Sequence, residues 1–211
     1  MTTATRFRQP ITTIEELRAL MAPPREAAVR KQSSALDEHC RDFIARSPFV
    51  FIATSNAAGD CDVSPKGHAP GFVRVLDKKT IVIPDRRGNN RLDSLQNIVR
   101  NPAVGLLFLV PGKHETFRVN GEAVLTRDPA LIARFEMQGK LPRTVVVVRV
   151  KEAYIHCSRA LLRADLWNPE KFTGAATVPS MGTMLAKHTC GFVDAETFDE
   201  DAKVKVPLTL Y

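Results

Sequence analysis

Three arginines cluster in a short glycine-containing loop near the middle of the chain. Arg86, Arg87 and Arg91 lie between a predicted strand that ends at Ile83 and a predicted helix that ends at Arg100. Backbone N–H groups at the start of a helix are unpaired and carry partial positive charge. Guanidinium groups beside such a helix start form charge-assisted hydrogen bonds with phosphate oxygens. The loop therefore predicts a phosphate-binding site.

The other residues of this loop are compatible with two interpretations. In the first, Asp85, Asn89 and Asn90 complete the phosphate site, and Gly88 permits a close approach of the backbone to the ligand. In the second, the segment is a solvated basic turn in which Asn89 or Asn90 caps the helix and no ligand is bound. The loop residues by themselves favour neither interpretation.

A predicted strand one hairpin earlier carries a second polar pattern. Because strand side chains alternate between faces, Asp62, Ser64 and Lys66 share one face, while Val63 and Pro65 share the other. A hydroxyl and an ammonium group on one face can bind an anion or the polar edge of a ring. A solvated polar face is the simpler interpretation of this motif alone, but the nearby arginine loop favours a binding role.

Other polar residues give weaker indications. Arg118 shares a predicted strand face with Thr116 and Asn120, where it either completes a polar pocket or meets a surface carboxylate. The histidines lack the spacing of metal ligands or of a catalytic triad, and neither G-x-S-x-G nor G-x-G-x-x-G occurs. The sequence therefore predicts no metal site and gives no support to a serine hydrolase or a Rossmann nucleotide site.

Composition restricts the class of protein further. With 211 residues, 44% of them hydrophobic, the chain is long enough for one folded unit with a core. No segment has the apolar length of a membrane span or of a secretion signal, so we expect a cytoplasmic protein. The net charge of +7 comes from dispersed lysines and arginines, which makes nucleic-acid binding the least favoured function. The four cysteines are widely spaced and are expected to be free thiols.

The hydrophobic pattern predicts a mainly β fold of the α+β class. Helices are predicted over residues 14–21, 24–46, 90–100 and 128–138, and strands over residues 49–55, 61–67, 72–76, 80–83, 103–110, 115–127 and 144–157. In the third helix, Leu92, Leu95 and Val99 are expected to face inward. Antiparallel hairpins interrupted by a few helices are typical of a small closed barrel. The segment from Phe172 onward has weak periodicity, which predicts an extended arm.

Several motifs occur in the same order as in one known family. They are DVSPKG, GFVRVLD, IVIPDRRGNNRLDSLQNIVRNPAVGLLF, ETFRVNGEAVLT and IHCSRALLRADLW. This order resembles the FMN-binding split-barrel proteins related to pyridoxamine 5′-phosphate oxidase, and in particular their branch of uncharacterised FMN-dependent flavoproteins. The resemblance implies a six-stranded Greek-key split β-barrel over residues 47–170. A helical segment (1–46) would precede the barrel, and an arm (171–211) would follow it and pack on the barrel or on a dimer partner.

The resemblance also implies how FMN is bound. It implies a homodimer with FMN at the interface, a strand at Val63–Lys66 that runs along the flavin ring and ribityl chain, and a phosphate site at Asp85–Arg91. Thr116 stands where members of the family often carry a glutamine near the flavin. Arg163 and Trp167 lie in the C-terminal region from which the partner subunit usually reaches the isoalloxazine ring.

The chain departs from true pyridoxamine phosphate oxidases near its last motif. Those enzymes have a tryptophan followed by an arginine-rich segment with R-x-H, whereas here Arg163 is followed by Ala164 and Asp165, and Trp167 comes later. The resemblance therefore implies an FMN-dependent oxidoreductase of another small molecule, without nucleic-acid or membrane partners. The alternative is a flavin- or haem-binding carrier or sensor on the same barrel, because a fold does not fix a function.

Overall fold

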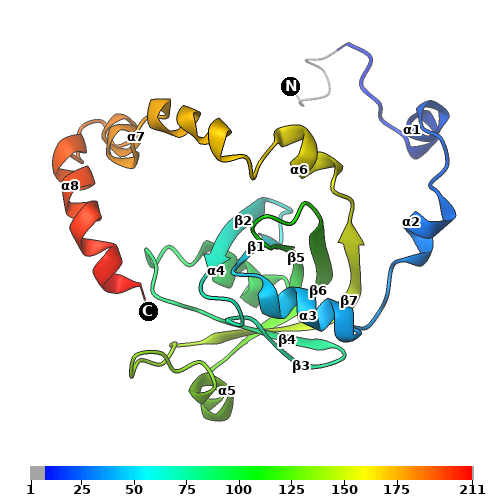
Figure 1. The fold of residues 1–211 in the computed structure, drawn as a ribbon, viewed down its shortest axis with the longest axis horizontal. Helices are drawn as coiled ribbons and strands as arrows, with labels where there is room; N and C mark the ends of the chain where they lie inside the picture. Colours follow the sequence, from blue (N-terminus) through cyan, green and yellow to red (C-terminus); the bar gives the residue numbers. More distant parts are fainter. Residues whose placement is uncertain (1–7, 211) are drawn as a thin grey trace. The chain divides into compact units, whose positions relative to one another are not determined.

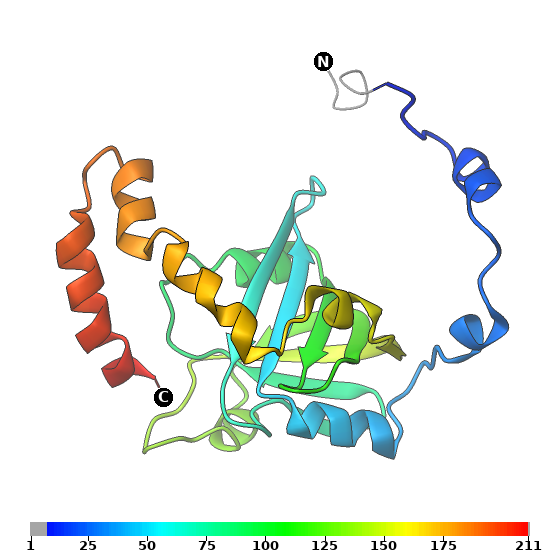
Figure 2. The same ribbon diagram turned by 45° about the horizontal axis from the view of Figure 1, so that its top comes forward.

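The computed structural model describes residues 8–210. Residues 1–7 and Tyr211, which belong to the two predicted end segments, lie outside the described part. The chain forms two compact units, of which the first ends at Gln32 and the second begins at Ser33. The second unit contains the strands of the described residues and the candidate site (Figures 1 and 2).

The first unit contains two short helices. Helix α1 (Ile14–Leu20) begins where the sequence predicts, because Thr13 and Glu16 form a reciprocal capping box. Helix α2 (Glu26–Arg30) begins after the proline pair that follows α1 and is five residues long. No residue of either helix is buried.

The prediction of one helix over residues 24–46 is wrong, because two helices occupy this range. Residues 31–37 between α2 and α3 (Glu38–Arg46) are not helical. The hydroxyl of Ser33 donates to the Ala35 carbonyl (2.7 Å) and accepts from the Ala35 amide (3.1 Å). Asp37 then caps α3 by accepting from the Cys40 amide (2.8 Å). Serine and aspartate side chains compete with helical backbone bonds in this way, which explains the break.

One antiparallel sheet of seven strands forms the second unit, with the order β2-β1-β5-β6-β7-β4-β3. The strands are β1 (Phe49–Ser55), β2 (Cys61–Gly67), β3 (Arg74–Asp77), β4 (Thr80–Pro84), β5 (Ala103–Leu109), β6 (Thr116–Thr126) and β7 (Val145–His156). The mainly β, α+β class is confirmed. The strand count of six is wrong, and in the described residues the sheet is not closed by pairing between its edge strands β2 and β3. Figure 2 shows the β1–β2 hairpin, in cyan, with a narrow turn at its tip.

The sheet curls around a main hydrophobic core, and a second, smaller cluster contains Val82, Phe135 and Val145. Alternate residues of β1 and β5 are buried, as expected for strands with one covered face. Strands from both halves of the sheet contribute to the main core, together with Ile44 of α3 and Ile98 of α4 (Asp93–Arg100). Helix α4 packs against β1, β2 and β6, while α3 packs against β3 and β6 (Figure 1). The two helices therefore hold the curled sheet in place.

Strand β6 contains a glycine that its position requires. The register between β6 and β7 shifts between Asn120 and Gly121, which marks an irregularity of the bulge type. A Cβ atom at Gly121 would lie 2.2 Å from the Arg149 carbonyl oxygen of β7. Only a residue without a side chain allows the two backbones to approach this closely.

The C-terminal segment is helical, so the prediction of an extended arm is wrong in its local structure. It contains α6 (Arg159–Ala164), the 3₁₀ helices η2 (Pro169–Thr177) and η3 (Pro207–Thr209), and the helices α7 (Met181–His188) and α8 (Ala195–Lys205). Ser180 and Asp194 cap α7 and α8 through their side chains. These caps stabilise the starts of two helices whose sequences lack a clear apolar periodicity.

Two further features bear on the predictions. Asp128 caps α5 (Pro129–Ala133), with Pro129 at the first position as predicted, but the helix ends well before Gln138. No helix in the described part of the chain is both long enough and apolar enough to span a membrane.

Candidate functional site

A cavity of about 480 Å³ lies between strand β2 and the arginine loop, and we call it the main cavity. Its walls come from Ser64 and Lys66 of β2, residues 85–92 of the loop, residues 93–95 of α4, and residues 141–143 before β7. The structure thus brings together the polar strand face and the arginine loop, which the sequence identified as separate motifs.

Both ends of the arginine loop are held by regular structure. At its start, the Asp85 amide donates to the Thr144 carbonyl (3.0 Å), which continues the β4–β7 ladder beyond its last pair of strand residues. At its end, the loop enters α4, which packs against β1 and β2. The loop is therefore fixed beside Ser64 and Lys66 by the sheet on one side and by a packed helix on the other.

Five cationic side chains line the main cavity, against two carboxylates. The cations are Lys66, Arg86, Arg87, Arg91 and Arg143, and the carboxylates are Asp85 and Asp93. Lys66 Nζ lies 3.4 Å from Asp85 Oδ1, and both side chains are partly buried. The excess of positive charge makes the cavity suitable for an anion of more than one charge.

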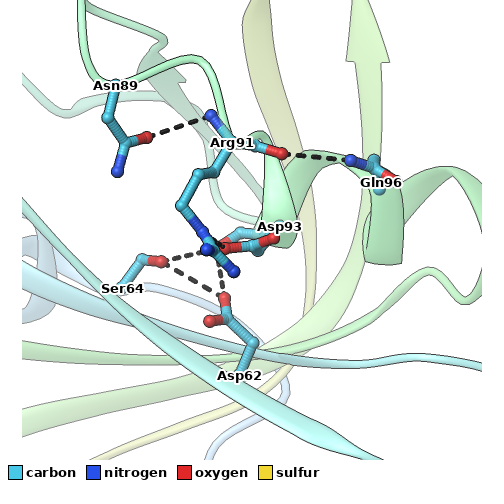
Figure 3. A network of polar contacts seen from close by, with 7 residues as sticks. Asp62, Ser64, Asn89, Arg91, Asp93 and Gln96 are labelled. Atoms are coloured by element: carbon cyan, nitrogen blue, oxygen red, sulfur yellow. Dashed lines mark hydrogen bonds and ion pairs between the residues drawn. The ribbon is translucent and has the colours of Figure 1, made fainter. Parts of the chain in front are cut away.

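The arginine at the end of the loop is held by an acidic neighbour. Arg91 Nε donates to Asp93 Oδ2 (2.8 Å), and this hydrogen bond, followed by the charges of Asp93 and Asp62, raises the pKa of Arg91 above its ordinary value. Arg91 and Asp93 are both largely exposed, so the pair orients the guanidinium rather than stabilising the fold. Figure 3 shows the pair above Asp62 and Ser64 of β2.

The loop backbone adopts an unusual conformation before the helix. Asn90 (φ 60°) and Leu92 (φ 63°) are both left-handed, which is uncommon for asparagine and rare for a bulky residue such as leucine. Asn89 Oδ1 accepts from the Arg91 amide (3.0 Å), and the Gln96 side chain donates to the Arg91 carbonyl (3.1 Å). Strained backbone of this kind is concentrated at functional sites.

In the second interpretation of the loop Asn89 or Asn90 caps the helix, and the structure contradicts this cap. Helix α4 begins at Asp93, its N-cap residue is Leu92, and no side chain caps it. Asn89 instead stabilises the loop itself, as described above. The uncapped first turn of α4 borders the main cavity, so its amides lie close to any bound anion.

A hydrogen-bond network lies beneath the cavity. Ser94 Oγ donates to Asp62 Oδ2 (2.5 Å), Ser64 Oγ donates to the same oxygen (3.2 Å), and the two serine oxygens are 2.8 Å apart. Ser94 is buried, with 5% of its surface exposed. In Figure 3 the side chains of Asp62 and Ser64 extend from β2 toward the start of α4. The network joins strand β2 and helix α4, which both contribute to the walls of the site.

Arg143 and Ser94 are among the residues of the cavity that the sequence analysis missed. Arg143 precedes β7 and reaches the site because β7 pairs with β4, the strand that leads into the arginine loop. Ser94 lies in the first turn of α4, directly after the loop. A single basic residue before a long strand, such as Arg143, forms no pattern that indicates a binding role. A serine directly after the arginine loop, such as Ser94, could have been recognised as a candidate for the same site.

Six of the residues predicted for the site do not line the main cavity. They are Val63, Pro65, Thr116, Arg118, Arg163 and Trp167. Val63 and Pro65 point away from it, on the opposite face of β2 from Ser64. Trp167 donates from its indole N–H to the Lys113 carbonyl (2.8 Å), and Arg163 is exposed on α6. The roles predicted for these residues beside a partner subunit stay predictions.

Arg118 and Thr116 lie together on β6. Thr116 is buried and pairs with His156 of β7. The Arg118 guanidinium donates to the Tyr154 hydroxyl (3.1 Å) and lies 5.7 Å from the centre of its ring. The structure therefore gives Arg118 a tyrosine partner, and its place in a polar pocket stays a prediction.

A second, more open groove of about 440 Å³ adjoins the main cavity. Leu92, Leu95, Val99 and Leu125 give it an apolar floor, and Asp85, Asn90 and Arg143 border both spaces. The expectation that Leu92 and Val99 face inward is wrong, because they are 48% and 73% exposed. Ser94 and Ile98 occupy the buried face of α4 instead.

The described residues contain no group of three or more histidine, cysteine, aspartate or glutamate side chains that is suited to a metal ion. The chemistry of the main cavity is that of N–H donors and positive charge, which suits a phosphate ester. A volume of about 480 Å³ is also within the range of small-molecule and cofactor pockets.

Comparison with known proteins gives one match to a protein family. The model of the family described as pyridoxamine 5′-phosphate oxidase matches residues 36–157, which include the whole sheet and α4. No curated protein sequence matches the chain.

Solved structures show distant similarity. HupZ from Group A Streptococcus is 19% identical with a TM-score of 0.46, over 56% of this chain and 91% of that protein. An FMN-binding protein from Syntrophomonas wolfei is 12% identical with a TM-score of 0.44, over 56% of this chain and 83% of that protein. An F420 reductase is 19% identical with a TM-score of 0.40, over 57% of this chain and 98% of that protein. These similarities are too distant to carry functional information.

Proposed function

The chain belongs to the pyridoxamine 5′-phosphate oxidase family, and we propose that it is a flavoprotein that binds FMN and acts as an FMN-dependent oxidoreductase on a small molecule. The observation that carries this proposal is the main cavity, where five cationic side chains and the uncapped start of α4 converge. A phosphate monoester is the group that this set of donors fits.

The phosphate would be held by the arginine loop. Arg86, Arg87 and Arg91 border the cavity from the loop, and Arg143 borders it from the segment before β7. The Nε and Nη1 atoms of Arg86 are buried, which places part of this guanidinium out of bulk water. Charge-assisted hydrogen bonds are stronger in such surroundings, so the phosphate becomes the main anchor of the ligand.

The rest of the cofactor would extend along β2. Ser64 and Lys66 face the cavity from this strand and would bond the ribityl chain or the polar edge of the ring. When bound, FMN supplies hydride exchange at its ring N5 atom. The ammonium of Lys66 would stabilise negative charge at the polar edge of the ring, and its ion pair with Asp85 holds that ammonium in place.

The predicted homodimer is part of the same proposal. The outer face of the sheet carries half-buried apolar side chains such as Phe51 and Leu107, and the neighbouring Val63 is 60% exposed. Such a face is suited to a second copy of the chain, which would bring Arg118, Arg163 or Trp167 near the flavin ring. In this arrangement the curled sheet corresponds to the split barrel of the family.

The substrate is proposed to differ from that of true pyridoxamine phosphate oxidases. The chain lacks their R-x-H segment after the tryptophan, and Arg163 and Trp167 occupy other positions. For the haem-binding alternative the candidate iron ligands are His156 and His188, and neither borders the main cavity.

The test of the proposal is the visible absorption spectrum of the purified protein, with mass identification of any bound molecule. FMN that co-purifies, or that remains after addition and removal of the excess, supports the proposal. Reduction of the bound FMN by NADH, NADPH or a deazaflavin donor distinguishes an oxidoreductase from a carrier. A protein that stays colourless after incubation with FMN would contradict flavin binding, and a Soret band would indicate haem.

A further inference from the structure

The walls of the main cavity differ in what they offer to a ligand. The five cations carry only N–H groups, so toward a ligand they are donors. The two hydroxyl groups in the lining belong to Ser64 and Ser94. A serine hydroxyl can donate or accept, so the surroundings of these two residues decide which role they take.

Asp62 influences the direction in which the hydroxyl groups of Ser64 and Ser94 donate their hydrogen bonds. It does not line the cavity, and its Oδ2 atom accepts from Ser94 at 2.5 Å and from Ser64 at 3.2 Å. The serine oxygens are 2.8 Å apart, so each serine has two acceptors within the network. If Ser94 donates to Asp62, the Ser64 proton goes to Asp62 or to Ser94. If Ser94 donates to Ser64, the Ser64 proton goes to Asp62.

In each arrangement both protons remain inside the network. At least one of them goes to a carboxylate, and hydrogen bonds to charged groups are stronger than neutral ones. A ligand group that only accepts would have to break one of these bonds, either to the carboxylate or between the two serines, to gain one from a serine. The lone pairs of the serines stay available, so a ligand N–H or O–H gains a bond at no such cost.

We propose that Asp62 is a positioning residue that makes Ser64 and Ser94 hydrogen-bond acceptors toward the main cavity. The cavity then selects phosphate esters that carry an N–H or O–H donor next to the arginine-bound phosphate. This inference rests on the proposed phosphate-binding function and adds the hydrogen-bonding character of the ligand. The hydroxyl-bearing ribityl chain of FMN meets the requirement, whereas an ether chain of the same length does not.

The experiment measures calorimetric Kd values of the flavin-free, full-length protein for two probes. These are D-ribitol 5-phosphate and its tetra-O-methyl ether, which share the phosphate and the chain but differ in hydrogen-bond donors. The wild-type protein is expected to prefer the hydroxyl probe by about tenfold, the size of one or two neutral hydrogen bonds. In Asp62→Asn the amide either donates to a serine and frees a serine proton, or accepts from a serine through a weaker bond to a neutral oxygen, so in both cases the ether binds more tightly than it does to wild type.

The preference in Asp62→Asn should therefore fall to about twofold or less. A gain in ether affinity is a readout that a purely structural role of Asp62 would not produce. The matched control is Asp60→Asn in the exposed turn before β2, which should keep the tenfold preference. If Asp62→Asn does not fold, Ser64→Ala gives a second test, because it should weaken the hydroxyl probe and leave the ether unchanged.

The outcomes separate this inference from the proposed function. FMN binding without any preference between the probes, or an unchanged preference in Asp62→Asn, would overturn the role of Asp62 alone. A clear preference in a protein that does not bind FMN would support the role of Asp62 and contradict the choice of cofactor. If neither probe binds to the wild-type protein, both the phosphate site and this inference are wrong.

Discussion

Lys66 on β2 and Asp85 at the start of the arginine loop form an ion pair across 19 residues of sequence, with Nζ and Oδ1 3.4 Å apart. The exposed fractions of the two side chains are 26% and 19%, so the pair is largely shielded from solvent. It connects the strand proposed to hold the flavin chain to the loop proposed to hold the phosphate. The two parts of the site are thereby set at a fixed separation.

Removal of the lysine charge should therefore weaken FMN binding. In Lys66→Met the Asp85 carboxylate loses its partner and stays beside the anionic ligand, so we expect the Kd for FMN to rise by about tenfold or more. Lys66→Arg keeps the charge and should restore most of the affinity. Flavin fluorescence titration measures both, and an unchanged Kd in Lys66→Met would remove this residue from the site.

Arg91→Ala should separate binding from stability. Arg91 is 73% exposed and contacts Asp93, another exposed residue, so its loss should leave the melting temperature almost unchanged. We expect the Kd for FMN to rise by about tenfold or more, because a charge-assisted bond to phosphate is lost. Arg127→Ala, at an exposed position after β6, is the matched control. Equal FMN affinity in Arg91→Ala and Arg127→Ala would contradict the assignment.

Gly121→Ala tests the contact between β6 and β7. A Cβ atom here would lie 2.2 Å from the Arg149 carbonyl oxygen, so one backbone has to move. We expect the free energy of unfolding to fall by about 3 kcal/mol, the cost of overpacking a tight site. Gly105→Ala on β5 is the control, since its nearest neighbour at 3.3 Å is the end of the Asn120 side chain. Equal midpoints of denaturant unfolding in Gly121→Ala and Gly105→Ala would argue against the close approach of the β6 and β7 backbones.

Cys40 should be the least reactive of the four thiols below pH 9. Burial, followed by the hydrogen bond with Asp37, raises the pKa of Cys40 from 9.0 to about 11. The thiolate is the nucleophile, so Cys61, Cys157 and Cys190, which are exposed, should be alkylated first at pH 8. Peptide mapping after brief alkylation measures this order, and early modification of Cys40 would contradict it.

The same shift in pKa has a consequence for stability. Between pH 9 and about 11 the unfolded thiol loses its proton while the folded thiol keeps it. The contribution of Cys40 to the free energy of unfolding is therefore complete below pH 9 and is lost as the pH rises toward 11. Cys40→Ala should unfold with a smaller loss of stability over this pH range than the wild-type protein.

Local sequence patterns were sufficient for much of the sheet. The predicted ranges 49–55 and 61–67 match β1 and β2, because a continuous apolar run and a strand with alternating polar residues flank a turn that contains Gly59. The same alternation correctly placed Ser64 and Lys66 on one face of β2. Such patterns depend only on neighbouring residues, which is why they can be recognised in the sequence.

Features set by distant contacts could not be predicted in this way. Arg143 reaches the site through the pairing of β7 with β4, and Ser94 reaches Asp62 through the packing of α4 on β2. Leu92 has a left-handed conformation and α4 begins after it, and the helix packs with Ser94 and Ile98 inward, which leaves Leu92 and Val99 exposed. Each of these outcomes depends on the register of strands or on the rotation of a helix, which the local sequence does not specify.

The comparison of FMN with riboflavin tests the central claim most directly, because the two ligands differ only in the phosphate. The account predicts that FMN binds at least about 100-fold more tightly, since several charge-assisted hydrogen bonds from the arginine loop are lost with the phosphate. Titration of the flavin-free protein with each ligand gives the two Kd values. Equal affinity for FMN and riboflavin would show that the cavity lined by Arg86, Arg87 and Arg91 does not hold a phosphate.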